Sequence, residues 1–111
     1  MVDYGTQYDR MYVTIVTYKP TNGKSAAEVV ESFDASAPLF RSIPGLIRKY
    51  FCFDDDAHEG TSVYVWQDRK SAEACFGNPE FLGRFKKSFG CDPTIKYVET
   101  KLVVDNAAKS Q

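Results

Sequence analysis

Apolar residues along this chain follow two spacings: alternate positions in short runs, and every third or fourth position in longer ones. The alternation over residues 11–18, 46–53 and 62–66 predicts three β-strands, and a fourth is expected over roughly residues 94–104. The wider spacing occurs twice and predicts two helical segments. One lies between the first and second strands, and the other lies between the third and fourth.

The first helical segment begins with a recognisable N-terminal signal. Ser25 followed by Glu28 is the residue pair that forms a capping box. The apolar stripe of this helix consists of Ala26, Val29, Val30, Phe33, Ala37 and Phe40. Pro38 has no backbone N–H to donate, so it should kink this helix or end it early.

The second helical segment is divided in two by Gly77. Asp68 can cap a short helix over residues 69–76, and the Asn-Pro pair at residues 78–79 can start another. The apolar stripe of this second piece consists of Phe81, Leu82, Phe85 and Phe89. Gly90 is expected to close it, because glycine readily adopts the left-handed conformation at a helix end.

The order strand, helix, strand, strand, helix, strand predicts an α+β fold of the ferredoxin-like βαββαβ type. Right-handed crossovers would place both helices on one face of a four-stranded antiparallel sheet. A chain of 111 residues can form one core. We therefore expect one domain over residues 11–106, a flexible arm over 1–10 and a frayed tail over 107–111.

The strands carry apolar side chains on both faces, so the sequence must be divided between a helix-covered and an open face. We expect the helix-covered face to hold Val13, Ile15, Ile47, Phe51, Phe53, Val63 and Val65. The opposite face would then hold Tyr12, Thr14, Val16, Tyr18, Arg48, Tyr50, Cys52, Tyr64 and Trp66. Lys49 would fall among the helix-facing residues. If Trp66 instead points toward the helices, the whole site is relocated and Lys49 moves to the cavity.

An aromatic face of this size predicts a partner or ligand. Two such sheets packed face to face would form a homodimer, and a small apolar or aromatic ligand could bind in a cavity there. An RNA-recognition module has the same topology with aromatic residues on its open sheet face. However, the third strand, GTSVYVWQ, lacks the basic and glycine positions of that module's signature.

Composition narrows the function classes. The formal net charge of −1 argues against binding nucleic acid or an anionic membrane, and no apolar run approaches the length of a membrane span. The three cysteines, Cys52, Cys75 and Cys91, have no metal-binding spacing and are typical of free thiols in a cytoplasmic protein. His58 lies in an acidic hairpin that we interpret as a solvated turn. We therefore expect no metal and no cofactor.

Three short motifs resemble the dimeric α/β-barrel superfamily, and within it the small antibiotic-biosynthesis-type monooxygenases. They are Pro44-Gly45-Leu46-Ile47-Arg48-Lys49, Val63-Tyr64-Val65-Trp66, and the Ser71-Ala72 pair that follows a charged turn. The resemblance covers about residues 11–106 and implies a homodimeric, cofactor-independent monooxygenase. Its substrate would be a small aromatic, quinol or polyketide-like molecule. Of the functional residues in such families, Trp66 is present here, whereas the first-strand Asn and the helical His of haem-degrading members are not.

The resemblance and the predicted open face suggest a site. As catalytic residues we predict Arg48, which would favour a bound phenolate, Trp66, which would stack on the ring, and Tyr64, which would orient a substrate oxygen. The predicted substrate-binding residues are Tyr12, Thr14, Tyr50 and Cys52. Two alternatives stay open: the same residues could fill a dimer interface, and the protein could be a non-catalytic dimer that binds a small molecule.

Overall fold

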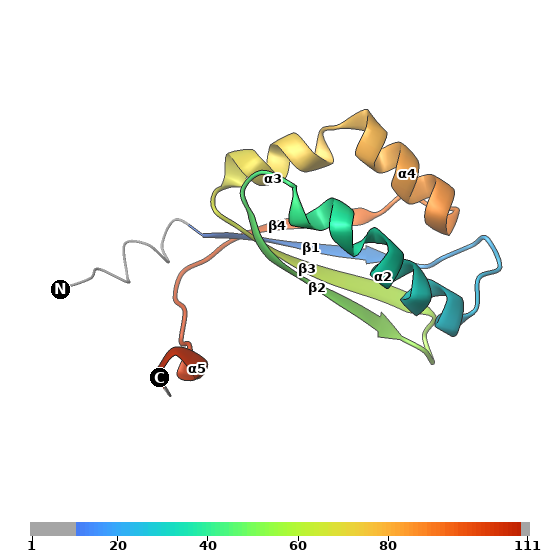
Figure 1. Ribbon diagram of the computed structural model, residues 1–111, viewed down its shortest axis with the longest axis horizontal. Helices are drawn as coiled ribbons and strands as arrows, with labels where there is room; N and C mark the ends of the chain where they lie inside the picture. Colours follow the sequence, from blue (N-terminus) through green and yellow to red (C-terminus); the bar gives the residue numbers. More distant parts are fainter. Residues whose placement is uncertain (1–10, 110–111) are drawn as a thin grey trace.

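The computed structural model describes residues 11–109 and contains a four-stranded antiparallel sheet with three helices above one face (Figure 1). The strands are β1 (Tyr12–Tyr18), β2 (Leu46–Asp54), β3 (Glu59–Trp66) and β4 (Thr94–Glu99). They lie side by side in the order β2-β3-β1-β4, and this arrangement confirms the ferredoxin-like fold. The predicted arm over residues 1–10 lies outside the described residues.

Helix α2 (Ala26–Arg41) begins at the predicted capping box. The backbone N–H of Glu28 donates to Ser25 Oγ at 3.2 Å, and the N–H of Ser25 donates to Glu28 Oε1 at 2.9 Å. The expectation that Pro38 ends this helix early is wrong, because the helix continues to Arg41. Pro38 lies on the exposed side of the helix, where water can bond the backbone carbonyl that its missing N–H leaves free.

Helices α3 (Arg69–Phe76) and α4 (Pro79–Phe89) follow the predicted division. The Asp68 side chain caps α3 by accepting from the N–H of Ser71 at 2.9 Å. Asn78 caps α4, and Gly90 ends it with a positive φ of 78°. The α4 end is tied to the loop after β1, since Thr21 Oγ1 donates to the carbonyl of Gly90 at 2.7 Å.

Strand β4 is shorter than predicted. It ends at Glu99, whereas the apolar pattern suggested a strand that continued to Val104. Glu99 pairs with Tyr12, the first residue of β1, so the hydrogen-bond ladder ends where its neighbouring strand begins. Residues 100–105 then leave the sheet and lead to the short helix α5 (Asn106–Lys109), which lies on the side away from α2, α3 and α4 (Figure 1).

The core lies between the sheet and the helices. Its largest fully buried side chains are Trp66, Tyr64, Val16, Val29 and Thr14. Four of these come from the sheet and one from α2, so the centre of the protein is a layer of strand side chains under the helices. None of the helices within residues 11–109 is both long and apolar enough to cross a lipid bilayer.

Candidate functional site: an aromatic chamber between the helices and the sheet

The structure reverses the predicted faces of β1 and β3. Tyr12, Thr14, Tyr64 and Trp66 point toward the helices and are buried, and the expectation that they occupy the open face is wrong. The open face, meaning the sheet face without helices, carries the half-buried Val13, Ile15, Val63 and Val65 instead. Both alternating sets are apolar, so alternation alone does not tell which set faces the helices. The larger aromatic rings bury more area against the phenylalanines of α2, α3 and α4.

The predicted site is therefore divided between two faces. Arg48 pairs with Val65 across the β2–β3 ladder, and Tyr50 pairs with Val63, so both lie on the open face with Cys52. Arg48 is exposed there, and its Nη1 donates to Tyr50 Oη at 3.1 Å. Of the predicted β2 positions, Phe51 faces the helices as expected. The register shift between Leu46 and Arg48 leaves Ile47, which we expected under the helices, 46% exposed.

Trp66 and Thr14 form a buried polar contact under the helices. The indole N–H of Trp66 donates to Thr14 Oγ1 at 2.9 Å, and both residues are completely buried. Tyr64 stacks parallel to Trp66 with ring centroids 5.6 Å apart, and the ring of Phe76 meets both edge-on. Burial raises the pKa of Tyr64 far above its ordinary value, which keeps the phenol protonated. Thr14, Tyr64 and Trp66 thus form a buried layer on the sheet, beneath the helices.

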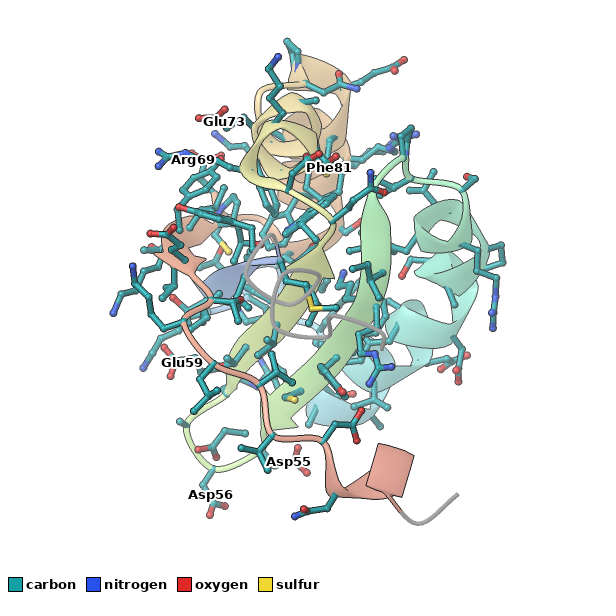
Figure 2. All side chains as sticks on the ribbon, turned by 90° about the vertical axis from the view of Figure 1, so that its left-hand side faces the viewer. Asp55, Asp56, Glu59, Arg69, Glu73 and Phe81 are labelled. Carbon is teal, nitrogen blue, oxygen red and sulfur yellow. The ribbon has the colours of Figure 1, made fainter. Side chains whose placement is uncertain are left out.

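Tyr12, a predicted substrate-binding residue, is covered by charged and aromatic neighbours. The guanidinium of Arg69 lies 5.6 Å from the ring centroids of both Tyr12 and Tyr97. Arg69 is itself held by Glu73, with Nε 3.1 Å from Oε2, and Figure 2 shows this pair on the outer side of α3. The Tyr12 ring therefore has a structural role: it packs against Arg69 and Tyr97 at the start of β1.

A cavity of about 140 Å³ lies between α2, α4 and the sheet, and we call it the aromatic chamber. Its aromatic lining consists of Tyr18, Phe33, Phe40, Phe51, Phe81, Phe85 and Phe89. Serine hydroxyls from α2, β3 and α4 also line it: Ser32, Ser36, Ser62 and Ser88. Figure 2 shows Phe81 on the side of α4 that faces the sheet. The lining also contains two charged side chains, those of Lys49 and Arg84.

Lys49 lines the aromatic chamber but was not among the site residues predicted from the sequence. Its Nζ lies 3.4 Å from the ring centroid of Phe40, 3.9 Å from that of Phe51 and 4.7 Å from that of Tyr64. Burial lowers the pKa of this amine from 10.5 to about 7. The signal in the sequence was the position of Lys49 among helix-facing β2 residues. Pairing of Lys49 with Tyr64 brings the amine under the helices together with the buried aromatic residues.

A wider hollow of about 610 Å³ adjoins the aromatic chamber between the end of α2 and the α3–α4 layer, and we call it the outer groove. Leu39, Phe81 and Arg84 line both spaces. The outer groove is more polar, because Asp68, Lys70 and Asn78 contribute to its lining. The shared residues show that the groove and the chamber are adjacent.

The open face has a hollow of its own. Residues 100–105 lie over one end of it and enclose about 670 Å³ together with Arg48, Tyr50 and neighbouring apolar residues. In this segment Leu102 is 81% exposed and Val104 is 73% exposed. A large apolar surface is therefore left uncovered on this side of the chain.

The acidic β2–β3 hairpin, residues 54–60, contributes no lining residue to these three spaces. Figure 2 shows Asp55 and Asp56 at the opposite end of the view from Phe81. Asp54 Oδ1 accepts from the N–H of Ala57 at 3.1 Å, and so its carboxylate closes the turn. Within the part of the chain that the structure describes, no three His, Cys, Asp or Glu side chains gather in a way that could hold a metal ion.

The chain is similar to one protein family and to several solved structures of the same fold. A family model described as antibiotic biosynthesis monooxygenase matches residues 11–86. Among solved structures, a variant of SnoaB, a cofactor-independent oxygenase from Streptomyces nogalater, is similar, with a TM-score of 0.65 and 16% identity. The similarity covers 85% of this chain and 96% of that one. No curated protein sequence matches the chain significantly.

Two further solved structures have the same fold. A monooxygenase from the gene ActVA-Orf6 of Streptomyces coelicolor, in complex with nanaomycin D, has a TM-score of 0.65 and 11% identity over 92% of this chain and 97% of that one. A protein of unknown function from Nitrosomonas europaea has a TM-score of 0.67 and 13% identity, covering 87% and 95% of the two chains. At these identities the likeness concerns the fold.

Proposed function

The chain belongs to the antibiotic biosynthesis monooxygenase family, and from this premise we propose that it oxygenates a small phenol or quinol in the aromatic chamber without a cofactor. The observation that carries the proposal is the amine of Lys49 against the rings of Phe40 and Phe51 in the chamber lining. With a pKa of about 7, about half of the Lys49 side chains are protonated at pH 7, and this cation next to a bound phenol favours the phenolate, because opposite charges stabilise each other strongly where water is excluded.

The chamber volume supports a substrate with one ring. A volume of about 140 Å³ is close to that of cavities that hold benzene, which measure about 150 Å³. Phenylalanine faces and edges pack well against an aromatic ring. The hydroxyl of Ser62 can donate a hydrogen bond to a ring oxygen, whereas that of Ser36 already donates to the carbonyl of Phe33 and can accept one from a ring hydroxyl. A single-ring quinol therefore suits the chamber better than a polyketide-like molecule with fused rings.

The proposed reaction balances without a further reductant. Loss of a proton to solvent converts the quinol to its anion, which is electron-rich enough to give electrons to dioxygen. One oxygen atom forms a bond to a ring carbon, and the other leaves as water after taking up two protons. The quinol loses four electrons in all and becomes a hydroxyquinone. Lys49 acts by holding the anion, and Trp66 and Tyr64 support the rings that enclose it.

Oxygen uptake with single-ring quinols tests this proposal. We expect uptake above the rate of spontaneous oxidation, and with ¹⁸O₂ we expect one labelled atom in each hydroxyquinone. Replacing Lys49 with Met removes the cation but keeps an apolar chain of similar length, and it should lower turnover about a hundredfold. Binding of a quinol without any oxygen uptake would favour the alternative, a non-catalytic small-molecule-binding protein.

Arg48 provides a matched comparison for this test. It neighbours Lys49 in sequence, but it faces the open side of the sheet and bonds Tyr50. If Lys49 is the charge that stabilises the anion, Arg48→Met should keep turnover within about twofold of the wild-type rate. If Arg48→Met is the variant that loses turnover, the catalytic role we predicted from the sequence belongs to Arg48, and the site lies on the open face.

We also propose that the open face is the interface of a homodimer. Half-buried valines and Ile15 cover its middle, and the exposed Leu102 and Val104 flank it. Monomeric proteins rarely leave such a contiguous apolar surface in water. Packing against a second copy would bury Val63 and Val65, and residues 100–105 would contact the partner. An interface that joins two sheets in this way buries roughly 2,000 Å² or more, as permanent dimers do.

A further inference from the structure

We propose that Lys49 is also a nucleophilic amine, and that it captures a single-ring aromatic aldehyde in the aromatic chamber as a reversible imine. This activity needs neither dioxygen nor a quinol, so it does not rest on the oxygenation proposed above. It makes the chamber a site for carbonyl compounds as well.

The surroundings of Lys49 favour an uncharged amine. The Nζ atom lies over the rings of Phe40, Phe51 and Tyr64, at 3.4, 3.9 and 4.7 Å from their centroids. Among the described residues, no Asp or Glu oxygen lies within 4.0 Å of it. A buried ammonium without a carboxylate is costly, so a lysine in such a place gives up its proton readily.

The ionisable groups that face Lys49 do not restore its charge. Arg84 of α4 lines the chamber with Lys49, and Arg41 of α2 lines a neighbouring surface hollow with it; both are cationic. Three further ionisable groups lie on this side of the sheet: the thiol of Cys75 of α3 and the phenols of Tyr64 of β3 and Tyr18 of β1. Burial raises the pKa of Cys75 to about 11 and that of both phenols well above 10, so all three are uncharged near neutral pH.

The result is a large fraction of free amine at neutral pH. With its pKa lowered to about 7 by burial, about half of the Lys49 side chains are unprotonated at pH 7. An ordinary exposed lysine has about one unprotonated side chain in a few thousand at that pH. Only the unprotonated amine has a lone pair for attack, and this is how a lysine in an apolar pocket becomes a nucleophile.

The chamber also admits and holds the aldehyde. Its volume of about 140 Å³ fits one aromatic ring, and the phenylalanines of α2 and α4 provide packing surfaces for it. Ser62 brings a hydroxyl donor to the same space, which can bond the carbonyl oxygen, whereas the hydroxyl of Ser36 already donates to the carbonyl of Phe33. Leu39, Phe81 and Arg84 line both the chamber and the outer groove, so the aldehyde would enter, and water would leave, by displacement of these side chains.

The chemistry conserves atoms and electrons. The lone pair of Nζ attacks the carbonyl carbon, and the π-bond to oxygen opens to give a carbinolamine after proton transfer from nitrogen to oxygen. The second amine proton and the hydroxyl group then leave as water, and a carbon–nitrogen double bond forms. No group is oxidised or reduced, and hydrolysis reverses both steps.

Reductive trapping of the wild-type protein tests the inference. Benzaldehyde and cyanoborohydride are added at pH 7 without oxygen, and peptide mapping follows the benzyl group on each lysine over time. We expect Lys49 to react at least about tenfold faster than Lys87, an exposed lysine of α4. The rate at Lys49 should rise with pH and level off above about pH 7, whereas the rate at Lys87 should keep rising.

Competition and a variant separate site binding from general reactivity. Benzyl alcohol, a neutral ligand with one ring, should slow labelling of Lys49 several-fold and leave Lys87 unchanged. Lys49→Arg should retain the slow labelling of Lys87 and lose the fast phase. Equal rates at Lys49 and Lys87, or fast labelling that benzyl alcohol does not slow, would overturn the inference. Either result leaves the oxygen-uptake experiment unaffected, so the two proposals can fail separately.

Discussion

The side chains of Lys49 and Arg48 lie on opposite faces of the sheet, so Lys49 is surrounded by aromatic rings whereas Arg48 is exposed to solvent. The pKa of Lys49 is about 7 in the folded chain and 10.5 as a free side chain, so between these values the unfolded chain binds more protons. Stability from this group therefore rises with pH, by at most about 1.4 kcal/mol per pH unit. Lys49→Met removes the cost of burying this amine, so the variant should be more stable than the wild type at pH 7. In urea unfolding, that difference in the free energy of unfolding should shrink from pH 7 to pH 9. Parallel pH curves would mean that Lys49 is not buried.

The Trp66–Thr14 hydrogen bond allows a second test on the scale of one residue. Thr14→Val keeps the shape of the side chain but leaves the buried indole N–H without an acceptor, and it should lower the free energy of unfolding by about 1–3 kcal/mol. The matched control is Thr17→Val, on the opposite face of the same strand, which should change stability by no more than about 0.5 kcal/mol. Urea titrations at one pH measure both. Equal effects would show that the hydrogen bond contributes nothing.

At the scale of elements, two glycines of the α4 region have opposite roles, Gly83 within the helix and Gly90 as the cap that follows it. Gly90 ends the helix with a φ of 78°, and a Cβ there would lie 2.7 Å from Thr21 Oγ1. Gly90→Ala should therefore destabilise the protein by about 1–2 kcal/mol or more. Gly83 lies within the helix with nothing within 4 Å of an added Cβ, and Gly83→Ala should stabilise by up to about 1 kcal/mol. Thermal unfolding of the two variants should give shifts of opposite sign. Two shifts of the same sign would contradict this account of the α4 end.

At the scale of the whole molecule, the exposed large apolar side chains Ile47, Tyr50, Leu102 and Val104 line one hollow on the open face. Val63→Lys would place a charge in the proposed dimer interface, and light scattering at micromolar concentration should show a shift from dimer to monomer. The control is Val30→Lys on α2, where the native valine is already 47% exposed and lies on the helical side. The Val30 variant should remain dimeric. A wild-type protein that is monomeric at that concentration would overturn the dimer proposal.

Local signals in the sequence were sufficient to place the elements. Ser25, Asp68, Asn78 and Gly90 each act through groups within a few residues, and the structure has their caps where the sequence predicted them. The end of β4 was misplaced for a non-local reason. Whether residues 100–104 form a strand depends on a neighbouring strand to pair with, and β1 begins opposite Glu99.

The site was harder to predict, because Val13 and Thr14 are neighbours on β1 and either could have faced the helices. A strand that is apolar on both faces specifies its alternation but not its phase. The phase was decided by packing across the layers, where Tyr64 and Trp66 meet the ring of Phe76.

The sequence by itself determined the order of elements, their caps and the ferredoxin-like sheet, since these follow from the spacing of residues along the chain. Only the tertiary structure decided that Tyr64 and Trp66 lie under the helices on the same face as Lys49, so that Lys49 rather than Arg48 has the aromatic neighbours. The physical reason is that a side chain's surroundings depend on strand register and on helices distant in sequence. Those surroundings give Lys49 its aromatic neighbours and an amine that loses its proton near neutral pH.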